Sequence, residues 1–512
     1  MGVMKLSPVR LAVAVLMCLP VCLTGAGAEA AVPVVRSSLL WRSCDAPTPI
    51  QGSGDRPDTL RDGTPWECAK LWVPLRYGDP EYGAIQLALI RVQARPKAGQ
   101  ARIGSLVFNF GGPGGSGVAT LPLAVNTFLS LHERYDLVSF DPRGVGESAG
   151  VSCLSDKAYD ELLTLDATPD DDTERRALSA GTRTFIAACE DNSARVLPYV
   201  GTENAARDMD LLRQALGERT LYYYGASYGT ELGGVYAHLF PENVGRMVFD
   251  AVVDPESDTV GHSLGQAKGF QLALGNFLKD CARRSGCATG RDPAQGAARI
   301  ASLLKRLDDR PLRTSSGRLL TQSHATFGIA SALYSKESWT YLDRGLGTAF
   351  DGNGDILLLF ADALNGRDQR GRYNNLQPAN TAINCADTSD RYTEADVRRE
   401  LPAFRKASPV FGEFLAWSIL QCTDWPVTGR TKSVDVSAAG ASPILIVGNT
   451  GDPATPYEGA HRMATRLGSG VGVELIVKGE GHGAYGSDTC ATQKIDTYLL
   501  TGKTPPNRTV CG

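Results

Sequence analysis

Residues 221–240 read LYYYGASYGTELGGVYAHLF, and this stretch decides the fold. The aromatic run 221–224 is typical of a short strand, and 230–240 is typical of a helix. Between them lies GASYG at 225–229, the G-x-S-x-G sequence of a nucleophile elbow. Glycine at both ends suits a turn so tight that side chains there would collide with neighbouring backbone. The stretch therefore predicts a Ser227 hydroxyl raised off the backbone, where it can attack a carbonyl group.

A serine nucleophile needs a base to take its proton, and the chain has six histidines. His262 lies in a polar loop, and four others lie in helix-like segments: His132, His238, His324 and His461. Only His482 follows a clear strand, residues 473–477, and it stands in the glycine-lined loop 479–483. Because glycines leave room for an imidazole ring, we predict that His482 is the base.

Asp452 is the predicted carboxylate that orients this base. Residues 443–448 read as a buried parallel strand, and they lead into the loop NTGDPATP at 449–456. An aspartate in such a loop is ordinarily a turn former. Its position between a strand and a helix, 30 residues before His482, favours the catalytic role, because α/β-hydrolases carry their triad in the order Ser, Asp, His.

Residues 105–117, SLVFNFGGPGGSG, read as a strand followed by a glycine-rich turn. We expect an N–H near Gly112 to pair with the N–H of Tyr228 and hold an oxyanion. The same turn contains G-x-G-x-x-G, and Asp141 ends the next strand, which is an alternative dinucleotide-binding pattern. We disfavour it because Pro122 interrupts the helix that would receive a pyrophosphate, and because that fold would leave the triad unexplained.

Five motifs are specific as a set: FGGPGGSG at 110–117, FDPRGVGES at 140–148, GASYGT at 225–230, FPENVGRMV at 240–248 and GDPATP at 451–456. Together they resemble the secreted tripeptidyl aminopeptidases of actinomycetes, relatives of prolyl aminopeptidase. Prolyl aminopeptidases commonly carry a histidine before the glycines where this chain has Asn109-Phe110, which suits the tripeptidyl branch better. The resemblance covers nearly the whole chain after its N-terminal segment, and it implies removal of short peptides from free protein N-termini.

Composition sets wider bounds. The 512 residues are 43% hydrophobic and 21% charged, enough for a large core and more than one domain. The net charge of −4 has no long basic run, so we expect no nucleic-acid partner. No Walker loop, HExxH or CxxC pattern occurs. We therefore expect neither a cofactor nor a metal.

The N-terminus is typical of an export signal, which we assign to residues 1–29. Lys5 and Arg10 supply positive charge, residues 11–23 an apolar core, and 26–31 small residues suited to cleavage. The apolar core is too short to stay as a membrane span. Cys18 and Cys22 lie in it without the preceding small residue of a lipoprotein signal. We expect a released extracellular protein with no stable membrane insertion.

Ten cysteines remain after that segment, and an even number outside the cell favours disulfides over free thiols. Short loops close most readily. Sequential pairing is therefore favoured: Cys44 with Cys68, Cys153 with Cys189, Cys281 with Cys287, Cys385 with Cys422, and Cys490 with Cys511.

Alternating strand and helix signals predict an α/β fold, with a mainly parallel sheet flanked by helices. We divide it into a first core part at 30–254, a helical cap at 255–440 and a last core part at 441–512. Cap helices are expected at 266–281, 292–308, 322–350 and 393–422. The acidic run 166–174 is interpreted as an exposed loop. Asp208 and Arg213, in a helix at 205–217, are interpreted as solvated charges.

An aminopeptidase also needs carboxylates that recognise the substrate's ammonium group in a closed pocket. Asp387 is the first candidate, in a loop between helices and beside Asn384 and a cysteine. Glu203, with Glu231 and Asp424, is a weaker candidate. A surface charge remains the plain alternative for each.

The sequence thus favours a secreted serine exopeptidase that releases short peptides, tripeptides above all, through an acyl-enzyme. Two enzymatic alternatives stay open, a carboxylesterase and a prolyl aminopeptidase-type hydrolase. A non-catalytic binding protein on a hydrolase fold is disfavoured, because the triad residues are all present.

Overall fold

The computed structural model describes residues 39–47 and 56–512. The predicted signal segment, with Cys18 and Cys22, lies outside the described residues. Within those ranges no helix combines the length and apolar character needed to cross a membrane.

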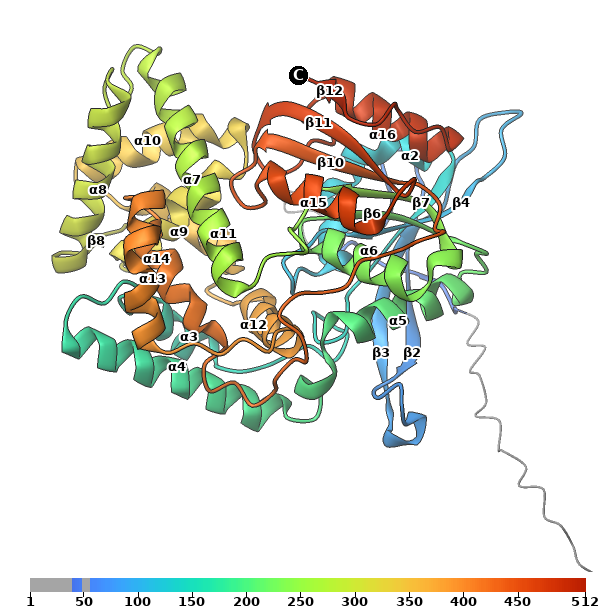
Figure 1. Cartoon of the computed structure of the whole chain (residues 1–512), viewed down its shortest axis with the longest axis horizontal. Helices are drawn as coiled ribbons and strands as arrows, with labels where there is room; N and C mark the ends of the chain where they lie inside the picture. Colours follow the sequence, from blue (N-terminus) through green and yellow to red (C-terminus); the bar gives the residue numbers. More distant parts are fainter. Residues whose placement is uncertain (1–38, 48–55) are drawn as a thin grey trace, which may run out of the picture. The chain divides into compact units, whose positions relative to one another are not determined.

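The chain folds around one ten-stranded sheet with the order β1-β2-β3-β5-β4-β6-β7-β10-β11-β12 (Figure 1). The strands are β1 (Arg42–Ser43), β2 (Trp66–Pro74), β3 (Ala84–Val92), β4 (Gly104–Asn109), β5 (Tyr135–Phe140), β6 (Leu221–Ala226), β7 (Val244–Asp250), β10 (Ile444–Gly451), β11 (Gly472–Glu480) and β12 (Thr509–Cys511). From β5 to β12 all neighbours are parallel, whereas β1, β2 and β3 add an antiparallel edge. The predicted mainly parallel sheet is confirmed.

Helices cover both faces of this sheet, which explains why its central strands are hydrophobic runs without polar alternation. One face packs on α5 (Thr202–Ala215), α6 (Tyr228–Leu239) and α15 (Tyr457–Leu467). The other packs on α1 (Gly117–Ala124), α2 (Leu129–His132) and α16 (Thr489–Thr501). Successive residues of β4 serve opposite faces, Leu106 one core and Val107 the other.

A second helical body lies between β7 and β10 in the chain, to the left in Figure 1. It contains α7 (Thr259–Ala282), α8 (Pro293–Asp309), α9 (Gln322–Leu333), α10 (Trp339–Phe350), α11 (Asp355–Asn365), α12 (Leu376–Asp387), α13 (Glu394–Ala407) and α14 (Gly412–Trp417). Most of these helices share a hydrophobic cluster of their own, which includes Phe277, Leu342 and Phe404.

Two helices from earlier in the chain join this body, α3 (Asp156–Leu163) and α4 (Asp172–Ser193). Leu178 of α4 packs against the cap cluster, and the N–H of Ala167 donates to Ser323 Oγ at 3.0 Å. The domain boundaries at 255 and 440 stay predictions, and residues 156–193 also contribute to the cap side.

Several local expectations are wrong. The run 166–174 is not simply a loop, because α4 begins at Asp172 behind a capping box on Asp171. The stretch 322–350 is mainly helical as expected, in two helices, α9 and α10, whereas α11 and α12 lie where no helix was predicted.

Asp208 and Arg213 are not solvated charges. The Asp208 side chain is fully buried, and its carboxylate accepts two hydrogen bonds of 2.6 Å from the guanidinium of Arg143, which is also buried. Arg213 Nε donates to Asp210 at 2.8 Å. A helix pattern cannot indicate this, because Arg143 lies 65 residues away in the chain.

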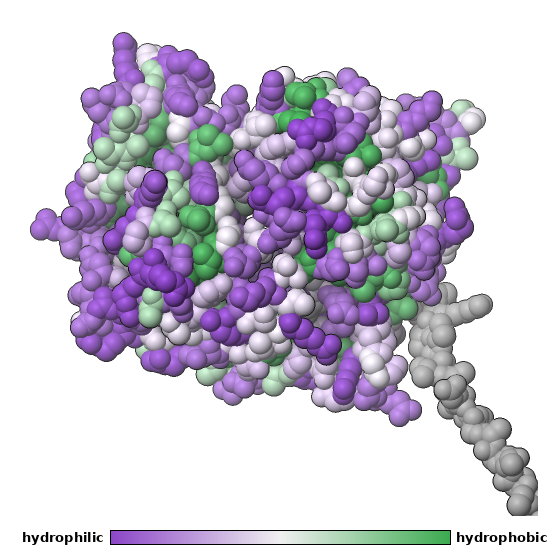
Figure 2. Space-filling view, in the orientation of Figure 1, coloured by the Kyte–Doolittle hydropathy of each residue, from purple (hydrophilic) through white to green (hydrophobic). Residues whose placement is uncertain are grey.

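Five disulfides cross-link the fold, and they are the pairs favoured by sequential spacing: Cys44–Cys68, Cys153–Cys189, Cys281–Cys287, Cys385–Cys422 and Cys490–Cys511. On the face drawn in Figure 2, hydrophobic residues form small separate patches among hydrophilic ones. Scattered patches of this kind are ordinary for a folded surface.

Candidate active site

Ser227 stands in the sharp turn between β6 and α6, with φ of 56° and ψ of −127°. A Cβ on Gly225 would lie 2.4 Å from the carbonyl oxygen of Gly229, and one on Gly229 would lie 2.6 Å from that of Asn109. Both glycines are therefore required by close backbone approach. The positive φ at a non-glycine residue is the strain expected of a nucleophile elbow.

His482 and Asp452 meet at the ends of adjacent strands. His482 Nδ1 lies 2.9 Å from Asp452 Oδ1 and 3.0 Å from Oδ2. Asp452 is only 1% exposed, and its Oδ1 also accepts the N–H groups of Ala454 and Thr455 at 3.0 and 2.9 Å. Burial alone would lower the pKa of His482, but the charge and hydrogen bond of Asp452, with the charge of Asp250, raise it.

The sheet explains this meeting. Ser227 follows β6, Asp452 follows β10 and His482 follows β11, and the strand order β6-β7-β10-β11 is parallel throughout. Carboxyl ends of parallel strands lie at one edge, where α/β proteins build their sites.

Asp250, which the sequence interpretation missed, lies at the same edge as the last residue of β7. Its carboxylate is 1% exposed and accepts hydrogen bonds from the N–H groups of Ala484 and Tyr485 and from the hydroxyl of Tyr224. Its backbone carbonyl accepts the N–H of Ser227 at 3.0 Å. One residue thus ties the serine turn to the loop that carries His482. The sequence feature that could have indicated Asp250 is an aspartate at the end of a hydrophobic strand.

The glycine-rich turn lies against the elbow. A Cβ on Gly111 would be 2.7 Å from Ser227 Cβ and 3.2 Å from Tyr228 N. Gly112 and Tyr228 line the same cavity as Ser227. Tyr228 is the first residue of α6, so its N–H has no acceptor within the helix. The backbone N–H groups near Gly112 and at Tyr228 therefore lie in the same cavity as Ser227, where they could bind an oxyanion.

The dinucleotide alternative has no support in the structure. Asp141 is 1% exposed, and its carboxylate already accepts from the Ser116 hydroxyl at 2.6 Å and the Val118 N–H at 3.1 Å. Gly117 is needed for packing, since a Cβ there would lie 2.3 Å from the Phe140 carbonyl oxygen. Pro122 does not interrupt the helix as expected; it lies inside α1.

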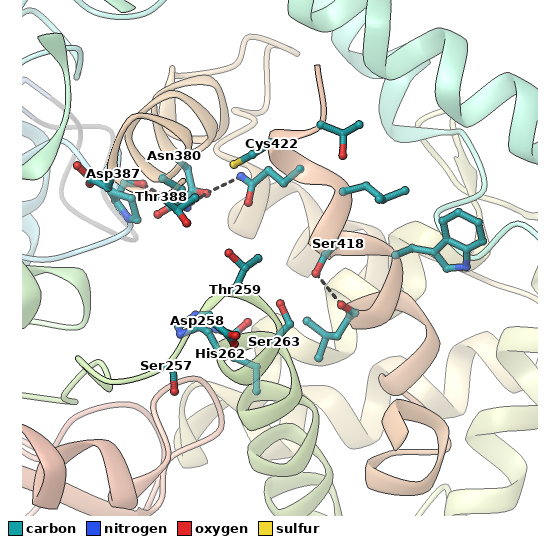
Figure 3. A pocket seen from close by; sticks show the side chains of 18 of the residues that line it. Ser257, Asp258, Thr259, His262, Ser263, Asn380, Asp387, Thr388, Ser418 and Cys422 are labelled. Carbon is teal, nitrogen blue, oxygen red and sulfur yellow. Dashed lines mark hydrogen bonds between the residues drawn. The ribbon is translucent and has the colours of Figure 1, made fainter. Parts of the chain in front are cut away.

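A cavity of about 770 Å³ lies between the Ser227 elbow and the cap helices. Figure 3 shows Asn380 and Asp387 of α12 on one side, and Ser418 and Cys422 of the 3₁₀ turn Ser418–Cys422 on another. His262 projects from the start of α7. That position corrects the expectation of a polar loop for His262.

Asp387 is the last residue of α12, rather than part of a loop. The helix continues to it because no glycine or proline interrupts 379–387. Its Oδ1 accepts the N–H of Thr202 at 2.7 Å, and its Oδ2 accepts the Thr202 hydroxyl at 2.6 Å. That hydroxyl oxygen is also 2.6 Å from Tyr228 Oη. Burial raises the pKa of Asp387 to about 7.

Glu231 lies one helical turn after Ser227 on α6 and lines the cavity. Its carboxylate has no hydrogen bond or ion pair to any described residue of 39–47 and 56–512. Burial, followed by the negative charge of Asp387, raises the pKa of Glu231 to about 8. The sequence ranked Glu231 as weaker, but it lies in the first turn of the helix that directly follows the nucleophile, and both residues line the cavity.

The other predicted binding residues differ. Asn384 and Asp424 line the cavity, and Asn384 Nδ2 donates to Asn380 Oδ1 at 3.0 Å. Glu203 does not line the cavity; its side chain is 64% exposed and pairs with Arg207 at 2.7 Å. We therefore remove Glu203 from the site, because a helix pattern could not show which face of α5 is solvated.

Comparison with known proteins decides the family. A family model described as TAP-like protein matches residues 408–511. Serine protease Hip1 of Mycobacterium tuberculosis is 40% identical over 468 residues, 87% of each chain. Tripeptidyl aminopeptidase of Streptomyces lividans is 31% identical over 502 residues, 94% of this chain and 88% of that one. The chain belongs to the tripeptidyl aminopeptidase family of α/β-hydrolases.

Membership of the tripeptidyl aminopeptidase family makes the protein a serine hydrolase. The family also contains a relative named for another substrate class, Carboxylesterase B of M. tuberculosis, which is 35% identical over 504 residues, 95% of this chain and 92% of that one. The substrate of this chain therefore has to be argued from its own cavity.

Proposed function

We propose that the protein is a secreted serine exopeptidase that releases short peptides, tripeptides above all, from free N-termini. The observation that carries this proposal is the carboxylate of Glu231, unpaired among the described residues and close in the chain to the nucleophile. Asp387 faces the same cavity, and its charge acts on Glu231.

The reaction would follow the acyl-enzyme route. Ser227 attacks the scissile carbonyl while His482 takes its proton, and Asp452 holds the imidazole by Nδ1. The N–H groups near Gly112 and at Tyr228 stabilise the oxyanion. Protonated His482 then donates to the leaving amine, and water hydrolyses the acyl-enzyme.

Glu231 and Asp387 are both partly buried, and a carboxylate that is partly withdrawn from water without a cation loses favourable solvation. Burial raises the pKa of both Glu231 and Asp387. An ammonium group placed between them would supply the missing cation and two charge-assisted hydrogen bonds. A neutral ester supplies neither, so the pair favours a substrate with a free N-terminus.

Two features support secretion. Five disulfides suit an oxidising compartment. Residues 1–29 have the composition of a signal peptide. N-terminal sequencing of the protein found in the culture medium would test both its export and the position of the cleavage site.

The direct test of substrate class is digestion of one peptide series with free or acetylated N-termini, followed by mass spectrometry of the products. We expect cleavage of the free series, with the length of the released fragment read from its mass, and little cleavage of the acetylated series. Equal cleavage of the two series would overturn the proposal. Fast hydrolysis of simple acyl esters without any peptide cleavage would instead support the carboxylesterase alternative.

A further inference from the structure

One wall of the active-site cavity is aromatic, and the proposed reaction does not yet use it. Phe327 of α9 and Phe414 of α14 line it, with their rings 5.0 Å apart in an edge-to-face arrangement. Tyr334, seven residues after Phe327, and Trp417, three after Phe414, continue the wall along the same two segments. We call these four residues the aromatic wall.

Phe327 lines the cavity without belonging to the cap cluster, and Tyr334 and Phe414 lie at the edge of that cluster. Phe327, Tyr334 and Phe414 are only partly buried, although Tyr334 and Phe414 also pack against the cap cluster, in which Trp417 is buried. Partly exposed aromatic rings that line a cavity are typical of a binding site for an apolar group.

One residue of the wall, Tyr334, lies beside the base. The Tyr334 ring is 5.1 Å from the His482 ring at an angle of 77°, and the Tyr334 carbonyl accepts the N–H of His482 at 2.8 Å. The carboxylates are linked to the other part of the site, since Asp387 reaches the Tyr228 hydroxyl through Thr202. The cavity therefore has an acidic part at the elbow helix and an aromatic wall that adjoins the histidine through Tyr334.

The chemistry orients a substrate between these two parts. The leaving amine receives its proton from His482, so the residue that carries this amine must lie on the histidine side. The substrate's ammonium group belongs with Glu231 and Asp387. We propose that the aromatic wall binds the side chain of the first residue of the leaving peptide, and that it selects apolar side chains there, aromatic ones above all. This inference rests on the proposed exopeptidase function.

The selectivity of the leaving-group subsite can be measured separately from that of the acyl group. The measurement is the partitioning of the acyl-enzyme between attack by an added amine and attack by water. An added amino acid amide attacks the acyl carbonyl through its free amine, gives up one proton to His482, and releases Ser227, whose oxygen regains a proton from His482. The products are an acylated amino acid amide and free enzyme. Competition between this step and hydrolysis measures how well the amide occupies the leaving-group site.

The acyl-enzyme is made in two ways, from the p-nitrophenyl ester of trialanine with a free N-terminus and from p-nitrophenyl acetate. Phenylalanine amide and leucine amide are compared with glycine amide and aspartic acid amide, each at the same concentration of free amine. We expect aminolysis by phenylalanine amide to exceed that by glycine amide by about tenfold or more, from burial of its side chain. Leucine amide should be intermediate, and aspartic acid amide should not exceed glycine amide.

Variants connect the preference to the wall. Phe327→Ala and Phe414→Ala should each reduce the ratio of phenylalanine amide to glycine amide several-fold, by about the value of one lost aromatic contact. Phe327→Leu should keep part of the ratio. Tyr341→Ala, an aromatic residue of α10 that is 57% exposed, is the matched control and should leave the ratio unchanged.

Equal partitioning of phenylalanine and glycine amides in the unmodified enzyme would overturn the inference, as would an unchanged ratio in both alanine variants. The acetyl-enzyme keeps this test independent of the proposed function. If the trialanine ester fails to acylate the enzyme while p-nitrophenyl acetate succeeds, the exopeptidase proposal fails, and the amide ratio still decides the role of the wall.

Discussion

At the scale of single residues, Ser227 is held in a constrained backbone conformation. Its positive φ is imposed by backbone contacts of two glycines, and its N–H is held by the Asp250 carbonyl. This geometry depends on the main chain rather than on the serine side chain. The hydroxyl can therefore be removed with little effect on the turn.

We predict that Ser227→Ala, His482→Ala and Asp452→Asn each lower kcat by about 10⁴-fold or more while leaving thermal unfolding nearly unchanged. Combining them should add little, because nucleophile and base act as one unit. Steady-state kinetics and labelling with a fluorophosphonate check this. Label found on a residue other than Ser227 would contradict the assignment.

The two cavity carboxylates predict a pH dependence of binding. Burial raises the pKa of Asp387 to about 7 and that of Glu231 to about 8, so both gain charge as the pH rises through this range. The KM for a free-amine peptide should therefore fall from pH 6 to pH 8. It should rise again above about pH 8, where the substrate's α-amino group loses its proton.

The matched variant is Glu231→Gln, which should remove the part of this fall that lies nearest pH 8. The KM of an uncharged ester should show no such profile in either enzyme. A KM for the free-amine peptide that stays flat across this range would mean that the carboxylates do not bind the ammonium group.

At the scale of elements, the site is assembled from strand ends, and Asp250 joins two of them. Without its carboxylate, the N–H groups of Ala484 and Tyr485 and the Tyr224 hydroxyl lose a buried acceptor. Each such group costs about 1–3 kcal/mol when unsatisfied. We predict that Asp250→Ala lowers both the free energy of unfolding and kcat.

Asp496→Ala provides the control, because Asp496 accepts a hydrogen bond from the hydroxyl of the same Tyr485 without touching the loop backbone. Denaturant unfolding and kinetics on both variants separate the effects. If Asp250→Ala kept a full kcat, the link between β7 and the His482 loop would have no role in catalysis.

The elements also show how much the sequence could predict. Some patterns are local in the chain, such as GASYG or a strand followed by a glycine loop. These patterns correctly predict the parallel strands, and they correctly place Asp452 and His482 in neighbouring loops. Contacts set by distant residues are not visible. The burial of Asp208 depends on Arg143, and the position of Asp387 depends on α12, whose first turn contains Pro378 and resembles a loop. A helix tolerates proline in its first turn, so Pro378 wrongly suggested that this segment is a loop.

The same limit applies to the binding residues. The sequence places Glu231 in the first turn of the helix after Ser227, but it does not show that this turn meets a cavity roofed by residues about 150 positions later. Glu203 on α5 has an equally plausible pattern and is solvated. Only the packing of the cap against the elbow distinguishes Glu231, which lines the cavity, from Glu203, which does not.

At the scale of the whole molecule, a disulfide holds the acidic part of the cavity. Cys385 and Cys422 close a separation of 37 residues, and Asp387 lies two residues beyond the first of them. We predict that the double variant Cys385→Ala, Cys422→Ala loses about 2–4 kcal/mol of stability. It should also raise the KM for free-amine peptides.

The Cys44–Cys68 bridge, which joins the residue after β1 to β2, is the comparison. The double variant Cys44→Ala, Cys68→Ala should lose stability but keep its KM. An equal rise of KM in both double variants would indicate a general loosening of the fold. Alkylation of the unreduced enzyme checks the five disulfides, and we expect it to label none of these ten cysteines.

The central claim is that Glu231 and Asp387 bind the substrate's ammonium group. The measurement that tests it most directly is the KM of Glu231→Gln and Asp387→Asn on a tripeptide p-nitroanilide with a free N-terminus and on p-nitrophenyl acetate. Loss of a hydrogen bond to a charged group predicts a rise in the peptide KM of about tenfold or more in each variant, with the KM of the acetyl ester little changed. Equal changes for the two substrates, or no change for the peptide, would contradict the account.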